Sequence, residues 1–224
     1  MIKLTPIAKH TKGADPSPPL QPDQEWANAL THGIAAAATM LAGGSLMLHA
    51  SGKSTGFVIA CGVYITSVLG TFVFSTLSHT IRTQPLLNTM RAWDQAMIYT
   101  MIAGTYTPLV YCYIDDPLRV WILTAMWVAA GLGFASKVAL RHRVNASGTI
   151  SYLLLGYLPA IPLAVQVPWN IGAMMVLGGM WYTIGVPMLV HDGRLRYLHA
   201  GWHMSVVVAA SIHFVGITMT LGSV

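Results

Sequence analysis

Seven stretches of mainly apolar residues run along the chain, separated by short polar connections. They cover residues 27–49, 56–78, 93–114, 120–140, 150–167, 170–190 and 199–221. Each is close to the roughly 20 residues that a helix needs to cross the hydrocarbon of a bilayer. No stretch shows the alternation that is typical of a barrel strand, and a bilayer leaves no water for unpaired backbone groups. The pattern therefore predicts an all-α integral membrane protein, a bundle of seven transmembrane helices.

The composition agrees with this fold class. Of 224 residues 54% are hydrophobic, with only 12 basic and 7 acidic residues, and the mean hydropathy is +0.59. Such values are typical of a membrane protein and not of a soluble domain. Residues 1–26 are polar and rich in proline, so we expect a disordered tail there. Residues 27–224 then form one membrane domain.

Basic residues are distributed unevenly between the two sides of the expected bundle. One side has only Lys53 and Arg119. The other side has the remaining ten, Lys3, Lys9, Lys12, Arg82, Arg91, Lys137, Arg141, Arg143, Arg194 and Arg196. The positive-inside rule predicts a cytoplasmic N-terminus and an external C-terminus. The net charge of +5 is explained by topology, so we expect no nucleic-acid partner.

Polar residues lie at the start of the first, third and seventh apolar stretches and at the end of the second. If the chain crosses the membrane seven times, all these positions lie on the same side. They are Glu25, Asn28, His32, Ser75, His79, Asp94, His199 and His203. Ionisable residues at the margin of a bilayer either snorkel to the interface or mark a functional site. The number of these residues on one side favours a site.

Three of the histidines suit a metal. His199 and His203 are four residues apart, so both imidazoles project from one helical face, although this spacing alone is a weak signal. His79 ends its stretch on the same side and completes a three-histidine set. Three protein ligands and a water form the catalytic zinc pattern, in which the pKa of the water falls towards about 7. We therefore predict that Zn²⁺ binds here.

Other residues at this level have supporting roles in the prediction. Asp94 is placed to hold the water, to act as a general base or to orient a histidine, or instead to face the positive end of its helix dipole. Ser75 is placed to donate to a reacting carbonyl oxygen or to Asp94. Glu25, Asn28 and His32 share one stripe, and we expect them to brace the site without binding metal.

Three further features have structural interpretations. His213 lies about 15 Å beyond His203 along its helix, so we expect it to be a hydrogen-bonded residue within the bundle. Cys61 and Cys112 lie near the outer ends of the second and third stretches, where a disulfide is possible, but we expect two unpaired buried thiols. Prolines at positions 108, 159, 162 and 187 predict kinks that open room inside the bundle.

Taken together, these residues resemble the progestin and adipoQ receptor family, specifically its bacterial hemolysin III branch. The matching runs are Glu25-x-x-Asn28-x-x-x-His32, Ser75-x-x-x-His79 with Asp94, Ala103-Gly-Thr-Tyr-Thr-Pro108, Gly178-Gly-Met-Trp-Tyr-Thr-Ile-Gly185, His199-Ala-Gly-Trp-His203 and His213-Phe214. The resemblance implies a seven-helix bundle in the bacterial inner membrane with zinc near its cytoplasmic face. It implies His79, His199 and His203 as ligands, with Asp94 and Ser75 around the metal-bound water. It also implies kinship with membrane hydrolases that cleave lipid amide bonds.

Three functions follow as hypotheses. The first is a zinc-dependent hydrolase of an acyl lipid, acting in membrane lipid homeostasis, with Asp94 as proton shuttle, Ser75 stabilising the oxyanion and the substrate chain in the kinked bundle. The second is a non-enzymatic sensor or regulator in which zinc only holds three helices together. The third is a pore, which the pattern favours least because charged residues do not recur through the bilayer depth.

Overall fold

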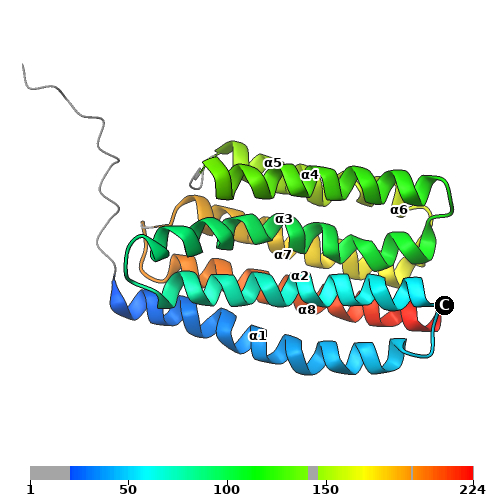
Figure 1. Cartoon of the computed structure of the whole chain (residues 1–224), viewed down its shortest axis with the longest axis horizontal. Helices are drawn as coiled ribbons and strands as arrows, with labels where there is room; N and C mark the ends of the chain where they lie inside the picture. Colours follow the sequence, from blue (N-terminus) through cyan, green and yellow to red (C-terminus); the bar gives the residue numbers. More distant parts are fainter. Residues whose placement is uncertain (1–20, 141–145, 193, 224) are drawn as a thin grey trace, which may run out of the picture.

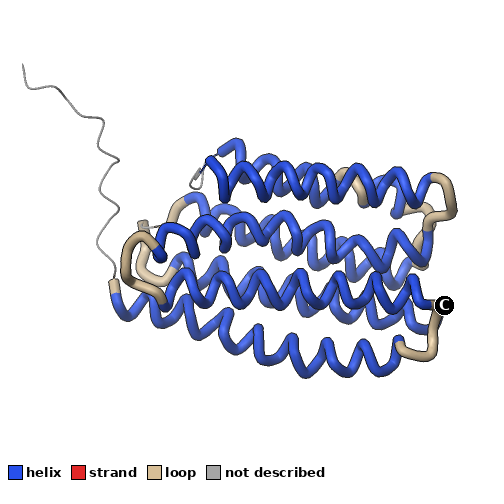
Figure 2. The backbone as a smooth tube through the Cα atoms, viewed as in Figure 1, coloured by secondary structure: helices blue, strands red, loops and turns tan. Residues whose placement is uncertain are grey.

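The computed structural model describes residues 21–140, 146–192 and 194–223, and within these ranges the chain contains helices and no strand. Figure 2 shows the helices running nearly parallel to one long axis, joined by short loops at the two ends. The bundle predicted from the hydrophobic pattern is therefore confirmed as all-helical. The expectation of a disordered tail over residues 1–20 concerns residues outside the described ranges.

Within the described ranges, eight α-helices and one short 3-10 helix follow in chain order. They are α1 (Pro22–Ala50), α2 (Thr55–Thr80), α3 (Leu86–Tyr113), α4 (Leu118–Leu140), α5 (Ala146–Tyr157), α6 (Ala160–Leu163), α7 (Trp169–Val190), α8 (Leu198–Met219) and η1 (Thr220–Gly222). Helices α2, α4, α7 and α8 match their predicted ranges to within two residues at each end, apart from the continuation of α8 into η1.

Sequential helices pack as antiparallel neighbours, as short loops require. Helix α2 packs between α1 and α3, helix α4 packs on α3, and helix α7 packs on α8. Contact between α1 and α8 brings the first and last helices together, whereas α4 and α5 form the layer farthest from α1 (Figure 1). Fully buried side chains such as Phe57, Tyr64, Leu109 and Ile217 fill the interior.

Large apolar side chains cover the outside of the bundle. Leu41 is 80% exposed, and Val165 and Trp169 are similarly exposed. Water-soluble monomers rarely expose such extensive apolar surface, whereas a bilayer solvates it. Helices α1, α2, α4, α7 and α8 are each long and apolar enough to span a membrane, so the chain is a multi-pass membrane protein. The count of seven spans stays a prediction, because α3 is more polar and α5 is short.

Helices α1 and α3 begin earlier than the hydrophobic pattern indicates. Helix α1 begins at Pro22, inside the expected tail, and α3 begins at Leu86 instead of residue 93. The extension of α1 begins with a proline and that of α3 follows one, a common arrangement at helix N-termini, and each includes polar residues that interrupt an apolar run. An apolar pattern cannot detect them. The consequence is that Asp94 lies two turns inside α3 and does not face its N-terminal dipole.

The fifth predicted span is interrupted. Helix α5 ends at Tyr157, and a turn containing Pro159 leads into the four-residue α6. A proline removes a backbone donor, so this break is the kink that the sequence predicts. By contrast, α3 continues through Pro108 and α7 through Pro187.

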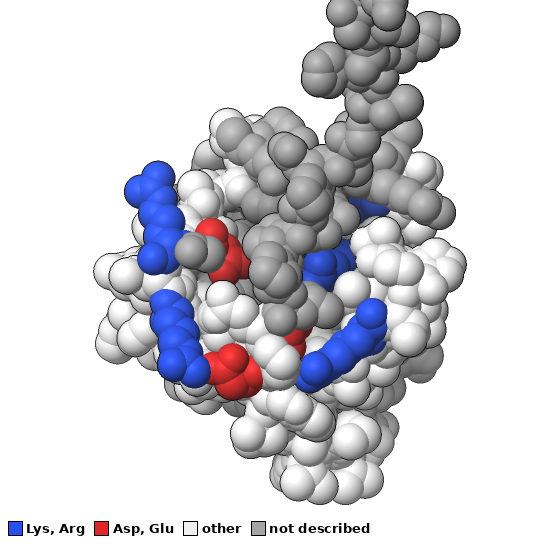
Figure 3. Space-filling view, turned by 90° about the vertical axis from the view of Figure 1, so that its left-hand side faces the viewer, with Lys and Arg blue, Asp and Glu red and all other residues white. Residues whose placement is uncertain are grey.

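Charged residues gather at the two ends of the bundle. Arg82, Arg91, Arg194 and Arg196 lie beside helix termini at the end where α1 begins. Viewed from that end, Lys and Arg side chains lie around a few Asp and Glu side chains (Figure 3). The separation of basic residues is thus confirmed for the described part of the chain. The assignment of this end to the cytoplasm stays a prediction.

Gly104 permits the close approach of α3 to α2. A Cβ atom at this position would lie 2.5 Å from Ser67 Oγ and 2.6 Å from Ser67 Cβ. We expect Gly104→Ala to destabilise the bundle by about 1–3 kcal/mol because the helices must separate. At this chain length each kcal/mol lowers the thermal midpoint by about 2–4 °C, measurable in detergent.

The matched control is Gly131→Ala, since a Cβ there would meet no atom within 4 Å. This variant should keep or slightly raise the midpoint, because alanine favours the helix. Equal midpoints for both variants would contradict the assignment of Gly104 to a close helix contact.

Candidate metal centre

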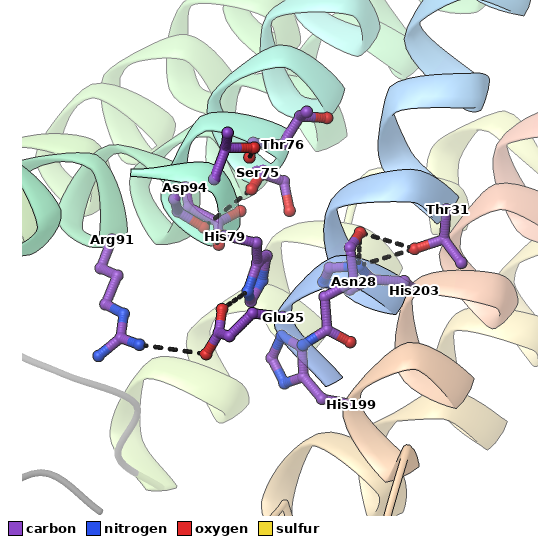
Figure 4. Close-up of polar contacts among 12 residues, drawn as sticks. Glu25, Asn28, Thr31, Ser75, Thr76, His79, Arg91, Asp94, His199 and His203 are labelled. Carbon is purple, nitrogen blue, oxygen red and sulfur yellow. Dashed lines mark hydrogen bonds and ion pairs between the residues drawn. The ribbon is translucent and has the colours of Figure 1, made fainter. Parts of the chain in front are cut away.

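Three histidines from α2 and α8 converge near the end of the bundle. His79 lies in the last turn of α2, and His199 and His203 lie in the first two turns of α8. One nitrogen from each ring lies within 4.8 Å of the others, a separation that one metal ion can bridge. Figure 4 shows the side chains from the two helices turned towards one another. The ligand set therefore joins two helices, not the three that the structural-zinc hypothesis assumed.

The Nδ1 atom of each ring faces an oxygen. His79 Nδ1 lies 2.7 Å from Glu25 Oε2, and His203 Nδ1 lies 3.1 Å from the carbonyl oxygen of Asn28. His199 Nδ1 lies 2.9 Å from Asp192 Oδ2, but it is not aligned for a hydrogen bond. A histidine whose Nδ1–H donates to an oxygen presents Nε2 as the metal ligand.

The arrangement fits a zinc ion. No Nε2 atom of the triad has a hydrogen-bond partner among the described residues, and that of His79 is fully buried. A buried polar atom without a partner costs free energy that a bound cation recovers. Three imidazole nitrogens with room for a further ligand form a donor set that zinc favours. The metal prediction thus fits the geometry, and the identity of the ion stays a prediction.

Glu25 connects α1 with α2 and α3. Its Oε2 contacts His79, and its Oε1 lies 3.5 Å from Arg91 Nη2. The predicted stripe of α1 therefore faces the triad. Asn28 contacts His203 through its backbone carbonyl, whereas its side-chain oxygen is buried without a partner. This contact does not depend on the asparagine side chain.

His32 packs against the triad and does not belong to it. Its ring stacks on that of His203 with centroids 3.7 Å apart and an interplanar angle of 8°. Both of its ring nitrogens are buried without partners. Thr31, which the sequence analysis did not single out, places its hydroxyl 3.2 Å from His203 Nδ1. Its spacing of three residues from Asn28 on α1 was the available signal.

The first turn of α1 is also tied to the start of α8. Asp23 forms an ion pair with Arg196 and accepts a hydrogen bond of 2.9 Å from the Tyr197 hydroxyl. The Tyr197 amide donates to Gln24 Oε1 at 3.1 Å, with Tyr197 in the left-handed region at φ 61°. These contacts place Glu25 beside the histidines that follow. Sequence reasoning missed them because they join segments about 173 residues apart.

Asp94 and Ser75 lie beside the triad on α3 and α2. Ser75 is fully buried, and its hydroxyl has no partner in the described part of the chain. It does not bond Asp94. Instead Ser78, overlooked in the sequence, places its hydroxyl 2.9 Å from Asp94 Oδ2 and 2.9 Å from the Ser75 carbonyl oxygen. Ser78 is one residue before His79, which would have identified it as a neighbour of the site.

The site opens into a cavity of about 290 Å³. Ser75, Asp94, His199 and His203 line one end of this cavity. Its remaining wall is mainly apolar and comes from α3, α5, α7 and α8, with the residues Ile98, Met101, Tyr106, Leu153, Met175, Val186 and Val206. The predicted space inside the kinked bundle therefore exists and is continuous with the histidine cluster.

His213 and the two cysteines, for which the sequence predicted structural roles, lie outside the histidine triad. His213 lines the far part of the cavity, outside the triad, and its Nε2–H donates to the Met175 carbonyl oxygen at 3.1 Å. Since His203 and His213 are separated by ten residues of α8, the cavity extends over about 15 Å along this helix. Cys61 and Cys112 are both free thiols, as predicted.

Comparison with known proteins places these residues in a family context. A family model described as Haemolysin-III related matches residues 20–214. The chain is 31% identical to Hemolysin-3 of Bacillus cereus, over 85% of this chain and 89% of the relative. It is 28% identical to the Hemolysin-3 homolog of Bacillus subtilis (strain 168), over 85% and 91%. Identity to the human monocyte to macrophage differentiation factor is 24%, over 85% and 82%.

No solved structure gave a significant match. The family resemblance predicted from the motifs is nevertheless confirmed, because the family model spans all the matching runs from Glu25 to Phe214. All eight predicted site residues lie within the matched range.

Glu25 provides a test of the metal site that needs no enzymatic assay. Glu25→Gln keeps an oxygen that can accept the His79 Nδ1–H but removes the charge, and Glu25→Ala removes both. Because such partners orient the ligand, we expect losses in zinc affinity of about 10-fold and up to 100-fold, respectively. Competition with a chromophoric chelator measures both values. Asp116→Asn, at the opposite end of the bundle, is the matched control, and a loss there of equal size would contradict the role of Glu25.

Proposed function

Because the chain belongs to the haemolysin-III related family, we propose that it is a zinc-dependent membrane hydrolase acting on an acyl lipid through an amide or ester bond. One observation carries the proposal. A single cavity is lined at one end by His199 and His203 of the triad, with Asp94 and Ser75, and over its remaining length mainly by apolar side chains. An acyl chain in this cavity would present its carbonyl group to the polar end.

Hydrolysis at this position uses each polar group in a defined role. Zinc, when bound by the three histidines, supplies a Lewis acid that stabilises negative charge on the acyl oxygen. Water adds to the acyl carbon as the bond to nitrogen or oxygen breaks. Asp94 accepts the proton of the water and returns it to the leaving group. Ser75, whose hydroxyl is buried without a protein partner, donates to the developing oxyanion.

Two neighbours hold these groups in place. Ser78 donates to Asp94 and thereby fixes the carboxylate on the cavity wall. Glu25 orients His79 from α1. We further propose that the site lies near the cytoplasmic face of the bacterial inner membrane, which the distribution of basic residues supports. The mainly apolar wall does not favour ion conduction, for which pores use rings of polar groups.

Metal content decides first between a metal site and a bundle joined by histidine contacts alone. We expect about one zinc per chain in detergent-purified protein, as three imidazole ligands require. His79→Ala and His199→Ala should each lose most of the bound metal, measured by elemental mass spectrometry. A folded wild type without metal would contradict the hydrolase.

Asp94→Asn separates catalysis from metal binding. The amide keeps the size of the side chain and an acceptor for Ser78 but cannot take up a proton. We expect the variant to retain zinc and to lose lipid turnover by about 10²–10⁴-fold, the contribution of general acid–base catalysis. Release of free fatty acid from a panel of amide- and ester-linked lipids measures turnover. Asp115→Asn, in the loop before α4, is the control.

The outcome also tests the regulator hypothesis. A zinc-loaded protein without turnover of any lipid in the panel, whose thermal midpoint falls on chelation, would favour a sensor with a structural zinc. Turnover that persists in Asp94→Asn would remove Asp94 from the mechanism.

A further inference from the structure

Lys137 occupies an unusual position for a basic residue in this bundle. It lies one turn before the end of α4, where a lysine would ordinarily extend its ammonium group to the interface. Instead it is only 3% exposed, with its Nζ 5.9 Å from the centre of the Tyr152 ring. The sequence analysis counted it among the basic residues of this end, where the structure also places it, but did not foresee that its side chain is buried. Ionisable side chains turned inwards at membrane depth usually serve a function.

The side chain of Lys137 lines the same cavity as the metal site. Among the described residues that line this cavity, it is the one lysine or arginine. It shares the polar end of the wall with Asp94, Gln95 and Thr149, and Gln95 Oε1 is buried without a hydrogen-bond partner. The polar end of the described lining thus carries one ammonium group, Lys137, and one carboxylate, Asp94. A zinc ion held by the triad would make this end net positive, next to an apolar interior. This combination matches an amphiphile that carries one negative charge.

Lys137 also lines a second space, a groove of about 790 Å³ between α4 and α5. It is the one described residue that the two spaces share. The groove is mainly apolar and includes Leu132, Leu154 and Leu158, which are more than half exposed on the outer surface. A lipid lying against this face of the bundle therefore meets the Lys137 side chain between the groove and the inner cavity.

We propose that Lys137 is a specificity-determining residue that binds the anionic group of the acyl lipid occupying the cavity. The chemistry is that of a carboxylate or a phosphate ester, both of which accept charge-assisted hydrogen bonds from an ammonium group. This proposal rests on the proposed function in one respect, the assumption that the ligand in the cavity carries an acyl chain. The charge preference is assigned to Lys137, the one lysine or arginine among the described lining residues, and Lys137→Met separates its contribution from that of bound zinc. The ligand is then an anionic amphiphile, and neutral lipids of equal chain length bind more weakly.

Binding experiments with matched lipids test this without any turnover. Zinc-loaded protein in detergent is titrated with palmitate and with palmitamide, which share one chain and differ in charge. We expect palmitate to bind at least about 10-fold more tightly, the effect of one hydrogen bond between charged groups. Native mass spectrometry with phosphatidylglycerol and phosphatidylcholine provides the phosphate arm. A preference in the first pair identifies a carboxylate, and a preference in the second pair identifies a headgroup.

Substitution then assigns the preference to Lys137. Lys137→Met nearly keeps the length and volume of the side chain without charge, and it should weaken palmitate binding about 10-fold while palmitamide affinity changes far less. Lys137→Arg should retain the preference, and Lys53→Met at the other end of the bundle is the matched control. Zinc content and the thermal midpoint report whether each variant is folded.

Two results would overturn the proposal. The first is equal binding of charged and neutral lipids by the wild type, which requires no variant. The second is a preference that is undiminished in folded Lys137→Met. Neither depends on hydrolysis, so a protein that binds anionic lipid without cleaving any lipid would disprove the hydrolase and leave the role of Lys137 intact.

Discussion

Burying polar side chains inside an apolar bundle requires that each find a partner, and this constraint organises the whole basic end of the molecule. An imidazole nitrogen that is buried from solvent must face an oxygen, a donor or a metal, because an unpaired buried polar atom costs free energy. The contact of His79 with Glu25 meets this requirement from α1. The same contact brings α1 against α2 and α8 at the level of the triad. The Asp23 contacts with Arg196 and Tyr197 then hold the helix start in register.

The buried polar atoms that lack a protein partner lie where a bound metal or ligand would supply one. His79 Nε2 and the Ser75 hydroxyl are both buried without a hydrogen bond in the described part of the chain. A bundle built only for stability would pair such groups or replace them with apolar side chains. Their concentration beside an apolar cavity links metal binding, lipid binding and the proposed chemistry in one place. Lys137 adds a charge preference at the polar end of the same space.

The candidate site could be predicted from the sequence to the extent that helix periodicity places residues. His199 and His203 had to share a face, and His79 had to lie at the same end of an antiparallel neighbour. Asp94 was located at the right depth although the start of its helix was misjudged. Thr31 and Ser78 were missed although their positions, one turn after Asn28 and directly before His79, were available signals. By contrast, nothing in the local pattern distinguishes Asp192 from a solvent-facing polar residue in a loop.

The sequence by itself determined the helical class, the separation of basic residues and the set of residues at one end. The length of an apolar segment and the spacing of residues along it are local properties, so they do not depend on how the helices pack. Only the tertiary structure decided which atoms face which. It placed the Asn28 carbonyl against His203, Ser78 against Asp94, and Lys137 inside the bundle instead of at its edge. These outcomes depend on helix rotation and on contacts between distant segments, neither of which the periodicity of a single helix encodes.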